Sequence, residues 1–385
     1  MDLTIFALKQ LWKSDVDKNY YTNGGFPLQV AAISELFDNT NIICPVSSVD
    51  NTTNSLTKIK GKKVKVLELL TPMKGDGFIR KIYFIPWFFK NFKILITKIR
   101  QADAVHAVVM GDLGVIAMIL SLIMKKKLIV RYCGNWYKND SFSEKIVKLI
   151  MKLTAGGKNI MLATGASENH PSNRNSNVKW IFSTSLSENQ IKNNNIFKSI
   201  KSNNKYKILV VSRQTTDKGT HKVIQALNIL RKEFDIELTV VGGGPDLSYF
   251  KQLAKRLHIE DKIKFVGQVK QIDVFEFLKT ADFYCFPSIS SEGFPKSVIE
   301  AISFGIPVLC SSVSALPYLF KNGGGIILEE PHADDIVKKI KMLIKNKKQY
   351  EKISIEANNI SKKYSLENWK DTIKIHINEQ WTVSN

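Results

Sequence analysis

The sequence contains few cysteines and no long apolar run. Its four cysteines, Cys44, Cys133, Cys285 and Cys310, form no CxxC pair, which argues against a disulfide scaffold or a structural zinc site. No apolar stretch approaches the roughly 20 residues that span a bilayer. The first residues, MDLTIFALKQLW, lack the basic start and cleavage site of a secretory signal. We therefore expect a cytoplasmic location.

Two common nucleotide-binding motifs are also missing. The chain has no GxGxxG fingerprint and no GxxxxGK[ST] loop, which argues against a dehydrogenase or a kinase. It has no aromatic RNP pattern, zinc finger or recognition helix, so binding of nucleic acid would rest on charge alone and we expect no nucleic-acid partner.

Acidic residues are scarce relative to basic ones. The 385 residues include 56 Lys and Arg against 35 Asp and Glu, a net charge of +21. Residues 1–200 hold 28 basic and 14 acidic side chains, and residues 51–100 alone hold 12 and 2. This excess predicts an anionic surface, nucleic acid or membrane, opposite the first half. The alternative is a genome whose composition favours Lys, Asn and Ile codons.

Short apolar runs alternate with helix-length segments along most of the chain. Strands this apolar predict parallel sheets covered on both faces, so the fold class is α/β with two doubly wound halves. The expected strands cover residues 3–8, 42–46, 64–70, 104–109, 128–132, 207–212, 237–242, 263–266, 283–286, 307–310 and 325–328.

The length favours two domains, because a domain typically has about 150 residues. Residues 186–205 are rich in Asn, Ser and Lys and form the best linker. We therefore expect an N-terminal domain over residues 1–200 and a C-terminal domain over residues 201–365. A final amphipathic helix, residues 366–385, is expected to pack back toward the first domain.

The most specific motif is SEGFPKSVIEAISFGIPVLCS, residues 291–311. Pro295 suits the first turn of a helix, because its missing N–H would have no partner there. The backbone N–H groups that begin this helix, with the positive end of its dipole, predict an anion site at Lys296, Ser297 and Val298.

The same motif contains two carboxylates. Glu292 lies in the loop, and Glu300 lies about one and a half turns into the helix, roughly 7 Å further along. They suit hydroxyl groups at opposite ends of an elongated, phosphate-containing ligand better than an acid–base pair. Alternatively, Glu300 is a surface residue and GFP is only a turn.

Three further segments follow expected strands of the second half. Arg213 and Lys218 come after ILVVS, where two cations can neutralise a pyrophosphate, although a lone basic loop is more often solvated surface. The run Gly242 to Gly244 allows close backbone approach or a tight turn. FVGQV, residues 265–269, offers backbone groups to a planar base or is only a strand end.

These segments resemble, in the same order, those of the retaining glycosyltransferases of the GT4 group. The resemblance rests on Arg213, Lys218, GGGP, FVGQV and EGFPKSVIEA; it is dense over residues 205–330 and only general in the first half. It implies the GT-B fold, with two Rossmann-like domains facing across a cleft. It also implies transfer of a sugar, with retention, from a nucleotide sugar such as a UDP- or GDP-sugar, without a metal or cofactor.

The resemblance also implies roles for individual residues. Arg213 and Lys218 would bind the donor diphosphate, Glu300 the ribose hydroxyls, and Glu292 the transferred sugar. The expected catalytic residues are therefore Glu292, Arg213 and Lys218. The expected donor-binding residues are Gly24, Gly25, Gly243, Gly267, Gly293, Phe294, Pro295, Lys296, Ser297, Val298 and Glu300.

In the first half, Gly24 and Gly25 resemble paired glycines that open a helix facing the phosphates; an ordinary turn is the alternative. His106 lies at an expected strand end, where a core histidine with satisfied nitrogens is more common than a catalytic one.

One position departs from the family pattern. Many relatives carry a His before the glycine of LIVRYCGNWY, residues 128–137, but this chain has Cys133 there. Either Arg131, Asn135 or Trp136 fills part of the role of that histidine, or the acceptor is held differently. A lone cysteine after an apolar strand is expected to be buried.

Residues 78–100 interleave Trp and Phe with Lys and Arg, as expected where a helix touches anionic lipid without crossing it. A core helix with a charged outer face fits equally well. Together with the resemblance, this predicts transfer to a lipid-linked or oligosaccharide acceptor for a bacterial surface polysaccharide, at the inner face of the cell membrane. The alternative is a catalytically silent partner that binds nucleotide sugar and scaffolds a membrane glycan assembly complex.

Overall fold

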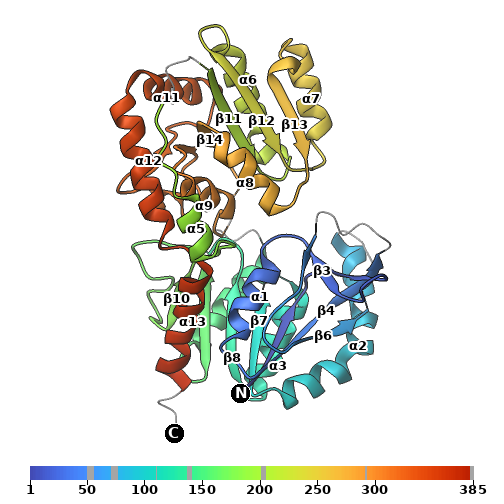
Figure 1. Ribbon diagram of the computed structural model, residues 1–385. Coiled ribbons are helices and arrows are strands. Elements are labelled where there is room, and N and C mark those ends of the chain that lie inside the picture. The colour runs from blue at the N-terminus through green and yellow to red at the C-terminus, as the bar shows by residue number, and fades with distance from the viewer. Residues whose placement is uncertain are drawn as a thin grey trace. The chain divides into compact units, whose positions relative to one another are not determined.

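The computed structural model describes residues 1–49, 56–70, 77–109, 111–136, 141–200, 205–290 and 293–381, which form two compact units (Figure 1). Unit 1 comprises Met1–Ile181 and Trp369–Asn385, and unit 2 comprises Phe182–Asn368. The division thus falls at residue 181, earlier than the boundary near residue 200 expected from the sequence.

The described part of the polar stretch taken as a linker, residues 186–200, packs within unit 2. It contains helix α5 (Glu188–Asn194), which opens with a capping box between Ser187 and Gln190. The side-chain amide of Asn194 donates to Ser303 Oγ over 3.2 Å, and Leu186 is fully buried. These contacts place the end of unit 1 before the stretch.

Unit 1 is built on a sheet of ten strands in the order β10-β9-β8-β7-β1-β4-β2-β3-β5, with β6 beside β4. All neighbours pair in parallel except β3, which runs antiparallel to β2 and β5. The strands are β1 (Asp2–Ala7), β2 (Leu11–Ser14), β3 (Tyr20–Thr22), β4 (Asn39–Val49), β5 (Thr57–Lys58), β6 (Val64–Leu69), β7 (Ala104–Val109), β8 (Lys127–Tyr132), β9 (Asn159–Thr164) and β10 (Val178–Ile181).

Helices cover both faces of this sheet. One face carries α2 (Gly77–Gln101), α3 (Asp112–Ile123) and α4 (Phe142–Thr154), whose buried residues share a core with Leu128 and Val130 of β8. Because side chains alternate along a strand, Arg131 points to the other face, where it contacts α1 (Phe26–Ser34) and α13 (Leu366–Trp381). Within the described residues, no helix combines the length and apolarity that crossing a bilayer requires.

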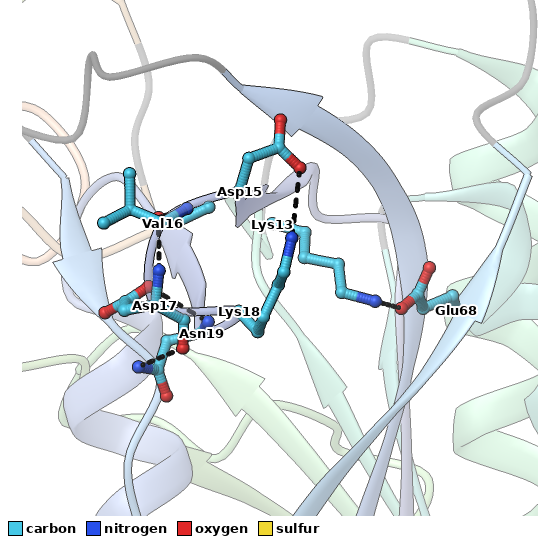
Figure 2. A network of polar contacts seen from close by, with 8 residues as sticks. Lys13, Asp15, Val16, Asp17, Lys18, Asn19 and Glu68 are labelled. Atoms are coloured by element: carbon cyan, nitrogen blue, oxygen red, sulfur yellow. Dashed lines mark hydrogen bonds and ion pairs between the residues drawn. The ribbon is translucent and has the colours of Figure 1, made fainter.

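The short hairpin of β2 and β3 leads into the glycine pair. Figure 2 shows the polar contacts of this hairpin. Lys13 Nζ lies 2.8 Å from Glu68 Oε1, and the backbone N–H of Asn19 donates to Asp17 Oδ1 over 3.1 Å. Tyr20 Oη also donates to Glu68, over 2.6 Å. The hydrogen bond from Lys13 holds the pKa of Glu68 below its usual range. The hairpin is thereby fastened to β6.

Unit 2 has a fully parallel six-stranded sheet in the order β13-β12-β11-β14-β15-β16. Its strands are β11 (Lys205–Val211), β12 (Asp235–Val241), β13 (Ile263–Gly267), β14 (Phe283–Phe286), β15 (Val308–Cys310) and β16 (Ile326–Ile327). Besides α5, its α-helices are α6 (Thr220–Leu230), α7 (Leu247–Arg256), α8 (Gln271–Thr280), α9 (Lys296–Ser303), α10 (Leu316–Leu319), α11 (Ala333–Lys345) and α12 (Lys347–Ser361). The α/β class with two doubly wound sheets is confirmed.

Candidate functional site

The strand order of unit 2 reverses between β11 and β14. From β11 the chain moves outward through β12 and β13, then returns to place β14 on the other side of β11. In open α/β sheets, ligands bind outside the carboxyl ends of the strands at such a reversal of strand order. The loop after β11 contains Arg213 and Lys218, and the loop after β14 leads to the motif around Gly293.

The two loops are hydrogen-bonded to each other. Lys218 Nζ donates to Ser290 Oγ over 2.7 Å, and the backbone N–H of Ile289 donates to the Asp217 carbonyl over 2.9 Å. Ser288 Oγ donates to the same carbonyl over 3.3 Å. The structure thus brings Lys218 to the loop that begins the EGFPK motif.

Gly219 permits this approach of the loops. It has a φ of +79°, and a Cβ there would lie 2.4 Å from the Pro287 carbonyl oxygen. No side chain fits at that distance, so glycine is needed both for the backbone conformation and for the contact.

Gln214, a residue that the sequence did not single out, connects the loop after β11 with the start of α6 and with the loop after β12. Its buried side chain donates to the Val241 carbonyl over 3.2 Å and accepts from Thr220 Oγ1 over 2.8 Å. Its backbone N–H donates to the Gly243 carbonyl over 3.0 Å. The neighbouring Arg213 is exposed, so its guanidinium can reach a ligand at the strand ends.

The glycine run after β12 divides into two kinds of position. A Cβ on Gly242 would lie 2.0 Å from the Ser212 carbonyl oxygen, and one on Gly244 would lie 2.2 Å from that of Gln214. These two glycines let the β11 and β12 loops pack together. Gly243 differs, because its Cβ would meet only Gln268, at 3.9 Å.

Gly267 lies beside this run. The Gly242 N–H donates to the Gly267 carbonyl over 2.8 Å, and a Cβ on Gly267 would meet no atom within 4 Å. The structure therefore brings together the two expected donor-binding glycines of this region, Gly243 and Gly267, at positions with open space.

The helix expected near Pro295 is α9, with Pro295 as its N-cap. Lys296 and Ser297 are partly exposed in its first turn. The Val298 N–H donates to the Pro295 carbonyl over 3.2 Å, so the expectation that this amide faces an anion is wrong, because the tight first turn engages it. Glu292 lies outside the described residues.

The segment before α9 is anchored by aromatic packing. Gly293 is buried, and the Phe294 ring packs against Tyr364 and Phe182, with ring centroids 5.3 and 6.2 Å away. These contacts fix the entry to the helix from within unit 2.

Glu300 is buried in α9, so it is not a surface residue. Its Oε1 accepts hydrogen bonds from Ser185 Oγ, over 3.0 Å, and from the side-chain amide of Gln271. Burial raises the pKa of Glu300, and these two donors oppose the rise. Ser185 and Gln271 were missed from the sequence, because no local pattern marks a donor that meets its acceptor only after folding.

In unit 1, Gly24 and Gly25 open α1 as expected. Gly24 has a φ of +73° with no atom within 4 Å of a Cβ, and Gly25 is the N-cap. A lysine missed from the sequence lies here: Lys9 Nζ donates to Asn23 Oδ1 over 2.5 Å. Burial lowers the pKa of Lys9, whose position after β1 puts a cation next to the glycine loop.

Two expectations for unit 1 are wrong. Cys133 is exposed rather than buried, because it lies beyond the last residue of β8. His106 is buried, but neither ring nitrogen has a hydrogen-bond partner within the described part of the chain. Burial, together with the nearby charge of Arg131, lowers the pKa of His106 to about 3.

The residues flanking Cys133 make structural contacts. Arg131 Nη1 donates to Gln29 Oε1 over 2.7 Å, and its guanidinium lies 5.5 Å from the Trp369 ring centre. Trp136 is buried, and its indole N–H donates to the Pro171 carbonyl over 2.6 Å. Among the described residues, no three His, Cys, Asp or Glu side chains gather closely enough to hold a metal ion.

Comparison with known proteins finds a family match in the second half of the chain. Residues 191–360 match the family model described as glycosyl transferases group 1. An uncharacterized glycosyltransferase of Haemophilus influenzae is 31% identical over 163 residues, which cover 42% of this chain and 45% of that protein. Protein CapJ of Staphylococcus aureus is 28% identical over 376 residues, covering 91% of this chain and 88% of CapJ. This chain thus spans less than half the length of the first relative.

Solved structures share the fold over the whole chain. HepE of Anabaena, solved with UDP and glucose, superposes with a TM-score of 0.69 at 16% identity and covers 98% of both chains. Sucrose-phosphate synthase of Thermosynechococcus elongatus gives a TM-score of 0.72 at 12% identity and covers 100% of both. The expected GT-B fold is confirmed.

Proposed function

Because residues 191–360 match the model of the group 1 glycosyltransferases, we propose that this chain transfers a sugar from a nucleotide sugar to a glycan acceptor, with retention of configuration. The observation that carries this proposal is the contact of Lys218 with the loop after β14, at the strand-order reversal of unit 2. It puts a cation, exposed Arg213 and the start of α9 around one crevice.

The diphosphate of the donor is proposed to bind between these groups. Lys218 and Arg213 supply charge, and the first amides of α9 supply N–H donors at the positive end of the helix dipole. The open positions at Gly243 and Gly267 let the nucleotide approach the backbone. The donor is a UDP- or GDP-sugar, and the HepE structure, which contains UDP, favours UDP.

Glu300 is proposed to bind the ribose hydroxyls. A buried carboxylate that already accepts from Ser185 and Gln271 has a fixed orientation, which suits it to accept from a second pair of donors. Glu292 is proposed to bind the transferred sugar, and Gly24 and Gly25 to approach the phosphates.

Transfer is proposed to occur on one face of the sugar. The acceptor hydroxyl attacks the anomeric carbon from the side on which the diphosphate departs, so one C–O bond forms as the other breaks. The hydroxyl proton passes to the departing diphosphate oxygen. Arg213, Lys218 and the α9 amides stabilise the charge on that leaving group, and the proposed reaction uses no metal or cofactor.

The acceptor is proposed to be a lipid-linked or oligosaccharide glycan of a bacterial surface polysaccharide, used at the inner face of the cell membrane. The similarity to CapJ, to the amylovoran biosynthesis glycosyltransferase AmsK of Erwinia amylovora and to the O-antigen biosynthesis glycosyltransferase WbnH of Escherichia coli supports a role in the synthesis of a surface polysaccharide. In α2, Trp87 is buried, whereas Ile85 and Phe89 are exposed beside Lys90, which supports contact with an anionic membrane.

A nucleotide panel tests the proposal. Thermal unfolding is measured with UDP, GDP, ADP and CMP, because a ligand that binds the folded state raises its stability. Release of sugar from the matching nucleotide sugars is then measured with and without a glycan acceptor. We expect stabilisation by UDP or GDP and release of the corresponding sugar. The absence of stabilisation by all four nucleotides, together with no sugar release, would contradict the proposal.

The second candidate is a catalytically silent partner that binds nucleotide sugar and scaffolds a glycan assembly. Cys133 favours it, because this exposed residue stands where the family resemblance expects a histidine. Stabilisation by a nucleotide without hydrolysis or transfer of its sugar would support this candidate over the enzyme.

A further inference from the structure

A basic groove of about 1010 Å³ lies in unit 1, between α4 and the segment that joins β9 to β10. Lys145, Lys148 and Lys152 line one side of it, and Arg174 with His170 lines the other. None of the described residues that line the groove is an Asp or a Glu. The described lining of the groove therefore carries positive charge only.

The three lysines come from one face of α4, because residues three and four apart lie together on a helix. Lys148 is the innermost; only 4% of its surface is exposed. Its ammonium donates to the Asn135 carbonyl over 2.9 Å and lies 4.8 Å from the Tyr132 ring centre. These contacts fix a charged group at the floor of the groove, while Lys145 remains exposed at its edge.

The outer surface of α4 is apolar. The exposed stripe consists of Phe142, Ile146, Leu149 and Leu153, which recur at helical spacing, and Phe142 and Leu153 are 77% and 73% exposed. Leu149 and Leu153 also line the basic groove. A continuous apolar stripe of this kind on a surface helix marks a binding surface for an apolar group.

A second hollow, of about 490 Å³, lies on the other flank of the helix, between α3 and α4. Its lining is mainly apolar and includes Phe84, Ile116, Ile119 and Ile150. Asp112 and Glu144 also line this hollow, so an anion would be repelled there. The helix therefore separates a cationic groove from an apolar hollow, with the stripe between them.

We propose that α4 holds an amphiphile with a diphosphate on a hydrocarbon chain, its diphosphate in the basic groove and its chain along the exposed stripe. Charge complementarity selects the head group, since four cations match a diphosphate, and the stripe provides the area that a hydrocarbon chain buries. The proposal rests on the proposed function in one respect: such a molecule would be the carrier of the lipid-linked acceptor.

Calorimetric titration of the full chain at 0.1 M NaCl tests the site with defined probes. Farnesyl diphosphate carries both parts of the proposed ligand, whereas inorganic pyrophosphate and farnesol carry one each. We expect farnesyl diphosphate to bind at least about tenfold more tightly than either fragment, the equivalent of about 1.4 kcal/mol. No binding of farnesyl diphosphate, or equal binding of pyrophosphate, would overturn the proposal.

Paired variants locate the site. The double substitution Lys145→Glu with Lys152→Glu is expected to weaken farnesyl diphosphate and pyrophosphate binding by about tenfold or more. Leu149→Ser with Leu153→Ser is expected to weaken farnesyl diphosphate and leave pyrophosphate unchanged. The matched control is Lys251→Glu with Lys255→Glu, two exposed lysines of α7 in unit 2, which should change neither affinity.

Two further measurements distinguish the α4 site from a general bilayer surface and from the nucleotide site. Sedimentation with phosphatidylglycerol vesicles but no binding of farnesyl diphosphate would show a general bilayer surface and overturn the proposal. Stabilisation of the α4 variants by UDP or GDP, measured in parallel, reports on the nucleotide site alone. The failure of the lipid site and the failure of the proposed function are therefore distinguishable.

Discussion

The ammonium of Lys218 donates a hydrogen bond to the hydroxyl of Ser290, 2.7 Å away and 72 residues later in the chain. This bond joins the loops after β11 and β14, where the strand order of unit 2 reverses. The bond holds the ammonium of Lys218 between these two loops, where its positive charge can attract an anion.

Removing this charge should impair transfer more than folding. We expect Lys218→Ala and Arg213→Ala each to lower kcat/KM for the nucleotide sugar by about 100-fold, because each removes positive charge from the departing diphosphate. Steady-state kinetics with the donor found in the nucleotide panel measures this loss. Lys232→Ala, an exposed lysine after α6, is the control and should behave as the unsubstituted protein. Near-normal turnover in both site variants would contradict the assignment of Lys218 and Arg213 to the departing diphosphate.

Two glycines with the same backbone conformation should respond differently to alanine. Gly219 and Gly267 both have a φ of +79°, but only Gly219 would place a Cβ against a carbonyl oxygen, at 2.4 Å. We expect Gly267→Ala to cost about 1–2 kcal/mol of unfolding free energy from the left-handed conformation alone. Gly219→Ala should cost clearly more, since the loops must separate. Urea unfolding compares the two, and equal costs would contradict the described contact.

Glu300 should stabilise the ligand complex and destabilise the free protein. Burial raises its pKa, so the folded state holds the proton at a pH where the unfolded carboxyl, at its ordinary value of 4.5, has lost it. Its contribution to stability therefore falls as pH rises from 4.5 through the folded-state pKa. We expect Glu300→Gln to melt higher than the unsubstituted protein at pH 7 and to bind UDP or GDP about tenfold more weakly.

Thermal melts from pH 4 to 8, with and without nucleotide, measure both effects. The melting difference between Glu300→Gln and the unsubstituted protein should narrow as pH approaches 4. Stronger nucleotide binding by the variant would show that the carboxylate does not face the ligand.

His106 should make unit 1 sensitive to acid. Its pKa is about 3 in the folded state, against an ordinary value of 6.5, so only the unfolded chain takes up this proton as pH falls below 6.5. Stability should fall by up to about 1.4 kcal/mol per pH unit in that window. His106→Leu should remove this slope, whereas His332→Gln, at a side chain 67% exposed, should retain it. Urea unfolding between pH 7 and 4.5 measures how the unfolding free energy of each variant depends on pH. The same slope in His106→Leu and His332→Gln would contradict the prediction.

The strands of the parallel sheets could largely be predicted from the sequence. Ala104–Val109 and Phe283–Phe286 have the expected bounds, because both are short apolar runs buried on both faces. The hairpin of β2 and β3 was missed, since its strands are short, carry polar residues and depend on pairing with β4. Strand β9, Asn159–Thr164, was not predicted, although its apolar run is typical of a buried strand.

The site was predictable where a motif follows a strand and unpredictable where loops meet. The positions of Lys218 and Pro295 follow from local pattern, because strand ends and helix starts have recognisable residues. Ser290 and Gln271 could not be assigned, because their partners come from distant segments. Lys9 was also missed, since a lysine after a strand is ordinary in sequence and significant only next to the glycine loop.

The comparison of a nucleoside diphosphate with its nucleoside tests the central claim most directly. Calorimetric titration of UDP and uridine, or of GDP and guanosine, gives the contribution of the diphosphate as the ratio of the two dissociation constants. If Lys218 binds the diphosphate, Lys218→Ala reduces this ratio by about tenfold and leaves nucleoside binding unchanged. An unchanged ratio in the variant would contradict a diphosphate site between the loops after β11 and β14.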